Sequence, residues 1–296
     1  MKLSYRARSM RRLVARFVQD DKMPLDERRA AMDRIDKLPR PRKVDYADTT
    51  VGGVPAIVAT PTDVDSDRHI LYLHGGGYLL GSPRSHIAMC ARLGKRARAT
   101  ITVIDYRLAP EHLYPAAIDD CVAAYRHLSA RVDPSMIAIA GDSAGGGATL
   151  STLCALRDAG DPLPACAYVL SPWTDLTGSG ESVRTKADID PMIRASALVS
   201  SGEMYAGETP LDDPGVSPLF ADLTGLPPML IQTGTDEVLL SDSTRLAERA
   251  SAAGVQTQFD LADGMWHVYQ AFAGYMPEAN EALAYAARFI RSQTPG

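Results

Sequence analysis

Hydrophobic and polar positions change their pattern twice along the 296-residue chain. Residues 1–42 carry the amphipathic spacing of one or two helices, which Pro39 and Pro41 end. Two runs of strand-like composition, 43–51 and 54–60, flank a pair of glycines and predict a hairpin. Further along, short apolar runs alternate with helically spaced segments. The predicted strands are 70–74, 100–106, 136–140, 165–170, 228–233 and 255–261, and the predicted helices are 85–98, 115–130, 144–159, 242–253 and 278–291.

This alternation of strands and helices favours an α/β fold with a mainly parallel sheet that helices cover on both faces. One connection is much longer than the others: 57 residues, 171–227, separate two predicted strands, with a helical patch near 194–205. Long insertions in compact domains are often functional lids. The predicted organisation is an N-terminal cap segment (1–42), a core (43–175), a cap insertion (176–216) and the rest of the core (217–296).

Composition is that of an ordinary globular protein, with 46% hydrophobic and 23% charged residues, which excludes global disorder. The net charge of −5 is unevenly distributed, since residues 1–45 carry +7 and the remainder −12. The basic segment alternates acids with bases, as a solvated helix face does, and the acidic remainder could hold it by attraction. Nucleic acid is therefore not an expected partner.

The four cysteines lie in apolar stretches and form no C-x-x-C pair, so neither a metal site nor a dithiol centre is expected. The chain starts without a secretory signal pattern and has no run of 18 apolar residues. From these patterns we expect a cytoplasmic protein without stable membrane insertion.

The first chemical signal is Gly141-Asp142-Ser143-Ala144-Gly145, which fits G-x-S-x-G between a predicted strand and a predicted helix. That context is the one in which a strained turn exposes a nucleophilic serine above the sheet. A glycine-rich turn with a surface serine is the plainer alternative. The strand–turn–helix context favours Ser143 as a nucleophile.

The second signal, His74-Gly75-Gly76-Gly77-Tyr78, follows another predicted strand. Consecutive glycines let backbone N–H groups converge on one point, as the oxyanion of acyl transfer requires. A phosphate-binding loop is the alternative, but neither a following Lys-Ser/Thr nor a G-x-G-x-x-G pattern is present. The expected oxyanion donors are the N–H groups of Gly76, Gly77 and Ala144.

A serine nucleophile on such a fold needs an acid and then a histidine later in the chain. His267 is the only one of six histidines that follows Ser143. Among the acids, Asp236 is best placed, because it follows a predicted strand after the two-residue turn Gly234-Thr235, where catalytic groups gather in open α/β sheets. Asp242 and Asp175 are the weaker alternatives. The predicted catalytic set is Ser143, Asp236 and His267, with no cofactor and no metal.

Together these motifs resemble the bacterial hormone-sensitive-lipase-like esterases of the α/β-hydrolase superfamily. The similarity extends from about residue 45 to the C-terminus. The matching stretches are HGGGY (74–78), DYRLAPEHLYPAAIDD (105–120), GDSAGGG (141–147), SPWTDL (171–176), GTDEVLLSD (234–242) and GMWH (264–267). The resemblance implies an eight-stranded sheet with a helical cap, and the same catalytic and oxyanion residues.

Two positions depart from the family pattern. The acid motif is usually Asp-Pro-Leu, whereas here it reads Asp236-Glu237-Val238, and Tyr78 stands where Phe or Trp is frequent. The resemblance also implies that the cap consists of the N-terminus and the insertion. These are the segments with the weakest match, and we expect them to select the substrate.

The expected function is a serine carboxylesterase acting on small-molecule esters of short to medium acyl chain length. An amidase or deacetylase would use the same residues. A ligand-binding homologue, like the plant gibberellin receptors that lack the histidine, is disfavoured because His267 is present. Proteins that resemble this chain commonly dimerise, so a homodimer is compatible with the sequence.

Overall fold

The computed structural model describes residues 3–17, 23–34, 39–64 and 67–295. Its centre is one eight-stranded sheet in the order β1-β2-β4-β3-β5-β6-β7-β8. Only β2 runs against its neighbours, pairing antiparallel with β1 and β4, and all other adjacent pairs are parallel. The strands are β1 Val44–Val51, β2 Val54–Pro61, β3 His69–Leu73, β4 Thr100–Ile104, β5 Ile137–Asp142, β6 Cys166–Leu170, β7 Met229–Gly234 and β8 Thr257–Ala262.

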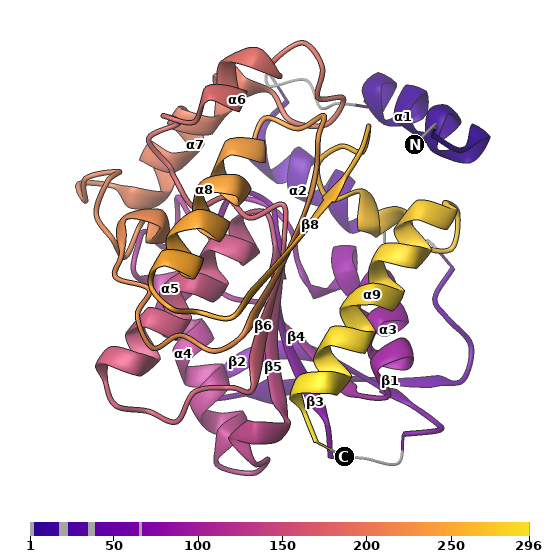
Figure 1. The fold of residues 1–296 in the computed structure, drawn as a ribbon, viewed down its shortest axis with the longest axis vertical. Helices are drawn as coiled ribbons and strands as arrows, with labels where there is room; N and C mark the ends of the chain where they lie inside the picture. Colours follow the sequence, from indigo (N-terminus) through magenta and orange to yellow (C-terminus); the bar gives the residue numbers. More distant parts are fainter. Residues whose placement is uncertain (1–2, 18–22, 35–38, 65–66, 296) are drawn as a thin grey trace.

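Helices cover both faces of this sheet (Figure 1). One face carries α3 and α9, and the other carries α4, α5 and α8, so the sheet separates two apolar cores. The central strands are buried along their whole length, as expected of a sheet with two covered faces. The bounds of these helices are α3 Pro83–Ala97, α4 Ala116–Ser129, α5 Ala144–Asp158, α8 Leu240–Ala252 and α9 Pro277–Gln293. The predicted α/β architecture is confirmed.

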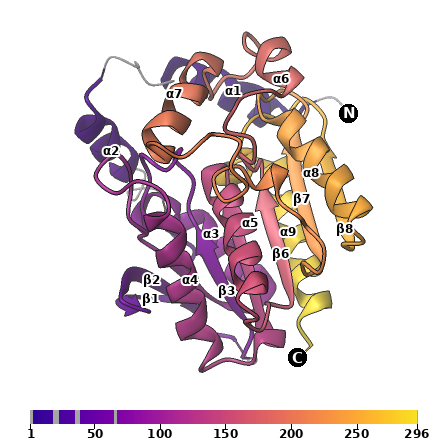
Figure 2. The ribbon, with the colours of Figure 1, turned by 90° about the vertical axis from the view of Figure 1, so that its left-hand side faces the viewer.

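The remaining α-helices lie beyond the carboxyl ends of the parallel strands (Figures 1 and 2). Two come from the N-terminal segment, α1 Tyr5–Phe17 and α2 Leu25–Asp33. Two come from the long insertion, α6 Glu181–Thr185 and α7 Ala195–Ala206. Short 3-10 helices occur at Pro134–Met136, Pro218–Phe220 and Tyr269–Phe272. Segments more than 150 positions apart in sequence thus meet over one edge of the sheet.

Each of the four cysteines is buried and free, in agreement with the prediction that they pack as small hydrophobic residues. No helix in the described ranges combines the length and apolarity needed to cross a bilayer.

Gly145 fixes how closely α5 approaches β3. A Cβ at this position would lie 2.0 Å from the carbonyl oxygen of Leu73, far inside van der Waals contact. Because α5 begins immediately after the turn that carries Ser143, this close approach also sets the height of the serine above the sheet.

We expect Gly145→Ala to lower the free energy of unfolding by about 3 kcal/mol, since the methyl group must displace backbone of β3 or α5. The matched control is Gly160→Ala, where a Cβ meets no atom within 4 Å and only the positive φ of 74° is strained. That control should lose about 1 kcal/mol. Urea unfolding of the three proteins measures both values, and equal losses would contradict this account of the packing.

Candidate active site

Ser143 lies in a sharp turn between β5 and α5. Its φ of 54° and ψ of −122° are strained values for a residue with a side chain. Two backbone hydrogen bonds hold it: its N–H donates to the oxygen of Leu170 at 2.9 Å, and its carbonyl accepts from the N–H of Trp173 at 2.9 Å. The sequence-predicted nucleophile therefore sits in a rigid, strained turn at the carboxyl edge of the sheet.

The glycine loop after β3 adopts a conformation that side chains would not permit. Gly76 has φ 126° and Gly77 has φ 66°, and a Cβ on Gly76 would lie 2.1 Å from the oxygen of Leu80. In the described part of the chain, no protein acceptor receives the N–H of Gly76 or of Gly77. Ala144 is the first residue of α5, so its N–H has no partner within the helix. These three donors are available to a bound oxyanion.

Asp142, the residue before Ser143, connects the two motifs. Its carboxylate accepts hydrogen bonds from the Tyr72 hydroxyl at 2.8 Å and from the Gly75 N–H at 3.1 Å. His86 Nε2 lies 3.4 Å from the other carboxylate oxygen. Burial opposes both charges, but their attraction prevails, so the pKa of Asp142 is lowered and the pKa of His86 is raised. This buried pair fixes the start of the glycine loop relative to the serine turn.

His74, which opens the glycine motif, is a structural residue. Its ring stacks on Tyr106 with centroids 4.2 Å apart, and the Tyr106 hydroxyl donates to the His74 carbonyl at 2.6 Å. Burial, with the nearby charge of His86, lowers the pKa of His74 to about 3. The ring is therefore neutral near neutral pH.

His267 is buried at the end of the loop after β8, and its Nδ1 lies 3.0 Å from Oε2 of Glu237. The other oxygen of Glu237, Oε1, accepts three hydrogen bonds. The donors are the Ser171 hydroxyl at 3.0 Å, the Thr233 hydroxyl at 2.5 Å and the Gly234 N–H at 2.5 Å. One carboxylate oxygen is thus anchored to the framework while the other faces the imidazole.

The carboxylate of Glu237 changes the pKa of His267. Burial by itself would lower the pKa of His267. The hydrogen bond and the charge of Glu237, with the charges of Asp190 and Asp142, outweigh burial and raise that pKa above its ordinary value.

The structure corrects the choice of Asp236 as the partner of His267, because the carboxylate in contact with the ring is that of Glu237. Asp236 forms a 2.7 Å ion pair with Arg11 of α1 instead, while Lys186 Nζ lies 4.0 Å from its other oxygen. The physical reason is the turn that follows β7, in which neighbouring side chains take different directions. A one-residue difference decides which carboxylate enters the site.

The weaker alternatives for the acid have other roles. Asp242 is buried at the start of α8 and accepts the N–H groups of Thr174 and Asp175, each at 2.8 Å. Burial raises its pKa to about 7. Asp175 binds Arg245 at 2.7 Å and the Ser179 hydroxyl at 2.5 Å. Both carboxylates fasten the start of the insertion to α8.

The Pro-Glu-His sequence also has a structural role. Both oxygens of Glu111 accept hydrogen bonds from Arg29 of α2, at 2.7 and 2.8 Å. The same guanidinium donates to the Leu79 carbonyl, directly beyond the glycine loop. The hydrogen bonding to Arg29 lowers the pKa of Glu111 to about 2. Helix α2 is thereby tied to the oxyanion side of the site.

An aromatic cluster fills the space behind the glycine loop. The ring of Tyr78 stacks on that of Tyr205 of α7, with the ring centroids 3.8 Å apart. The ring centroid of Trp173 lies 6.2 Å from that of Tyr78. All three are buried, whereas Met192 and Met204 of the insertion are 36% and 41% exposed. A Cβ on Gly77 would touch Trp173 at 3.9 Å, which places this cluster beside the oxyanion donors.

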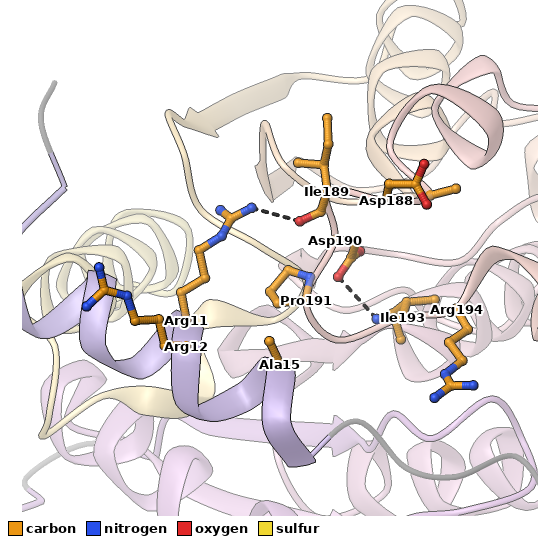
Figure 3. Close-up of a pocket in the computed structure, with 10 residues that line it drawn as sticks. Arg11, Arg12, Ala15, Asp188, Ile189, Asp190, Pro191, Ile193 and Arg194 are labelled. Carbon is orange, nitrogen blue, oxygen red and sulfur yellow. Dashed lines mark hydrogen bonds between the residues drawn. The ribbon is translucent and has the colours of Figure 1, made fainter.

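A cavity of about 650 Å³ lies between α1 and the insertion (Figure 3). Its lining residues include Arg11 and Arg12 from one side and Asp190 and Arg194 from the other. Asp190 accepts the N–H of Val238 at 3.0 Å, so this cavity adjoins the loop that carries Glu237. Within the described residues, no group of three or more His, Cys, Asp and Glu side chains is arranged to hold a metal ion.

Comparison with known proteins agrees with this architecture. The family model for the α/β-hydrolase fold matches residues 70–271. An acetyl-hydrolase of Streptomyces hygroscopicus is 40% identical over 272 residues, 91% of each chain. A crystal structure of an esterase from the bacterial hormone-sensitive lipase family superimposes with a TM-score of 0.96 over 100% of both chains, at 39% identity.

A further solved structure, of the esterase EstE5 soaked with p-nitrophenyl butyrate, has a TM-score of 0.94 and 37% identity, covering 98% of this chain and 99% of that one. The sequence identity, the matched length and the shared fold lead to one conclusion. The chain belongs to the bacterial hormone-sensitive lipase family of esterases within the α/β-hydrolase superfamily.

Proposed function

We propose that this esterase hydrolyses short- to medium-chain acyl esters with Ser143 as nucleophile, His267 as general base and acid, and Glu237 as the carboxylate that orients the histidine. The observation that carries this assignment is the 3.0 Å contact between His267 Nδ1 and Glu237 Oε2. It replaces Asp236 of the sequence-based prediction with its neighbour.

In the first step Ser143 Oγ attacks the carbonyl carbon of the ester, and Nε2 of His267 takes the hydroxyl proton. Nδ1–H donated to Glu237 leaves the Nε2 lone pair free for that proton, so the carboxylate selects the tautomer and stabilises the imidazolium. Collapse of the tetrahedral intermediate breaks the bond to the alkoxy oxygen, which receives the proton from His267. The products of this half-reaction are the alcohol and an acyl-enzyme.

The negative charge of the tetrahedral intermediate is stabilised by the N–H groups of Gly76, Gly77 and Ala144. Removing one such donor typically costs about 3–4 kcal/mol in the transition state. Asp142 supports this arrangement. It accepts the N–H of Gly75, and this hydrogen bond fixes the start of the loop that carries Gly76 and Gly77. A water molecule that gives a proton to His267 then attacks the acyl carbon; the bond to Ser143 Oγ breaks, the carboxylic acid leaves and His267 returns the proton to Ser143.

We assign the selection of substrates by size to the cap segments, residues 1–42 and 176–216, and to the aromatic cluster. The stacked pair of Tyr78 and Tyr205, with Trp173, occupies space beside the oxyanion donors that a long acyl chain would need. The similarity to a protein named acetyl-hydrolase and to an esterase soaked with a four-carbon acyl ester supports short acyl groups.

Substitution of the two adjacent acids distinguishes their roles. We expect Glu237→Gln to lower kcat by about 10⁴-fold, because a neutral amide neither fixes the tautomer nor stabilises the imidazolium. Asp236→Asn removes the same charge one residue away and should lose at most about tenfold, since its amide oxygen still accepts from Arg11. Steady-state hydrolysis of p-nitrophenyl butyrate by both folded variants gives the comparison. The opposite ranking would restore Asp236 as the orienting acid.

The raised pKa of His267 predicts the acid side of the pH profile. Only the neutral imidazole accepts the proton of Ser143, so kcat/KM should fall as the pH drops through a value above the ordinary 6.5. In Glu237→Gln the residual activity should fall at a lower pH than in the wild type, because burial remains while the hydrogen bond to the Glu237 carboxylate and its charge, the largest effects that raise the pKa of His267, are gone. If the acid limb of Glu237→Gln lies at the same pH as that of the wild type, the proposed contact between Glu237 and His267 is contradicted.

A series of p-nitrophenyl esters from acetate to palmitate tests the substrate class. We expect kcat/KM to peak at short acyl chains and to collapse in Ser143→Ala for every ester. A rate that rises up to palmitate would contradict the acyl limit set by the aromatic cluster. Absence of ester hydrolysis in a correctly folded wild type would favour an amide substrate instead.

A further inference from the structure

Arg11 of α1 makes three hydrogen bonds to three separate segments of the chain. Its Nη1 donates to Oδ2 of Asp236 at 2.7 Å and to the carbonyl of Gly264 at 3.1 Å. Its Nη2 donates to the carbonyl of Ile189 in the insertion at 2.7 Å (Figure 3). The Arg11 side chain is three-quarters buried.

Two of these segments are the loops that carry the acid and the histidine. Asp236 directly precedes Glu237, and Gly264 comes three residues before His267. The two loops also contact each other directly. The Asp236 N–H donates to the Met265 carbonyl at 2.9 Å, and the Gly264 N–H donates to the Thr235 hydroxyl at 2.8 Å. Arg11 spans this junction from outside the sheet.

The third segment belongs to the insertion, and it contacts the same loop. Asp190, next to Ile189, accepts the N–H of Val238, the residue after Glu237, and its charge acts on His267. Lys186 lies 4.0 Å from Asp236. Glu237 is therefore flanked on both sides by residues that the cap holds in place, and Arg11 is the cation that joins the two parts of the cap at this point.

Helix α1 itself is fixed at its other end. Ser4 donates from its N–H and its hydroxyl to the two oxygens of Glu278 in α9, at 2.8 and 3.0 Å. Helix α1 is thus also attached to the core at Ser4, independently of the loops that Arg11 binds.

We propose that Arg11 is a positioning residue for ester hydrolysis: by docking α1 onto the Asp236 carboxylate and the Gly264 carbonyl, it fixes the geometry of the Glu237–His267 pair. The inference rests on the proposed function of that pair. It makes the N-terminal segment part of the catalytic apparatus in addition to any role in substrate selection, because displacement of α1 loosens the acid and histidine loops together.

The test compares Arg11→Ala with Arg8→Ala, which removes the same charge from an exposed position one turn earlier on α1. For Arg11→Ala we expect kcat with p-nitrophenyl butyrate to fall about 10- to 100-fold, the size of effect that small misplacement of catalytic groups produces. KM should change little. Arg8→Ala should keep the wild-type kcat.

The pH profile separates positioning from general loss of structure. Because a loosened Glu237 raises the pKa of His267 less, the acid limb of kcat/KM in Arg11→Ala should move to lower pH. Arg11→Lys keeps the charge but reaches fewer acceptors, and should recover part of kcat. Asp236→Ala should add little to Arg11→Ala, since both remove the same contact. If Arg11→Ala does not fold, Arg11→Lys against Arg8→Lys provides the same comparison.

A wild-type kcat and an unmoved acid limb in folded Arg11→Ala would overturn the proposal. A rise of KM alone would also overturn it, because Arg11 would then act on the substrate. Neither result bears on the triad, which Glu237→Gln tests separately: an inactive Glu237→Gln beside a fully active Arg11→Ala would refute only the role of Arg11.

Discussion

The hydrogen bond between His267 and Glu237 is the interaction on which the rest of the site depends. It requires an ionised carboxylate deep inside the protein, and such a charge is costly unless it is fully hydrogen-bonded. Three hydrogen bonds to Oε1 of Glu237 offset this cost. Two of the donors lie at the end of β7 and one is the residue after β6. The parallel strands bring these donors, the serine turn and the histidine loop to one edge of the sheet.

The two N-terminal helices, α1 and α2, are attached near this edge by charged contacts. The N-terminal part of the chain is strongly basic and the remainder acidic, and among the described residues two arginines form defined ion pairs between these parts. Arg11 binds Asp236, next to Glu237, and Arg29 binds Glu111, near the glycine loop. Both ion pairs are reinforced by carbonyl acceptors, Gly264 for the first and Leu79 for the second. Each of these contacts joins a basic residue of an N-terminal helix to an acidic residue later in the chain.

Periodicity predicted the sheet and its covering helices, because alternation of short apolar runs with amphipathic segments depends on burial alone. Ser143 and the glycine loop were predictable because strained turns admit few sequences. The identity of the acid was not predictable from the sequence. Asp236 and Glu237 are adjacent carboxylates near the end of the same strand, and only the conformation of the turn after β7 decides which one contacts His267. The apolar run that begins at Val238 is a weak sign that Glu237 lies on the buried side.

Proton NMR of the imidazole N–H tests most directly whether Glu237 is the partner of His267. A proton held between Nδ1 and a buried carboxylate is protected from exchange and resonates far downfield of other N–H groups. We expect this resonance in the wild type and in Asp236→Asn, and its loss in Glu237→Gln and in His267→Ala. A resonance that survives in Glu237→Gln but disappears in Asp236→Asn would contradict the assignment of the acid.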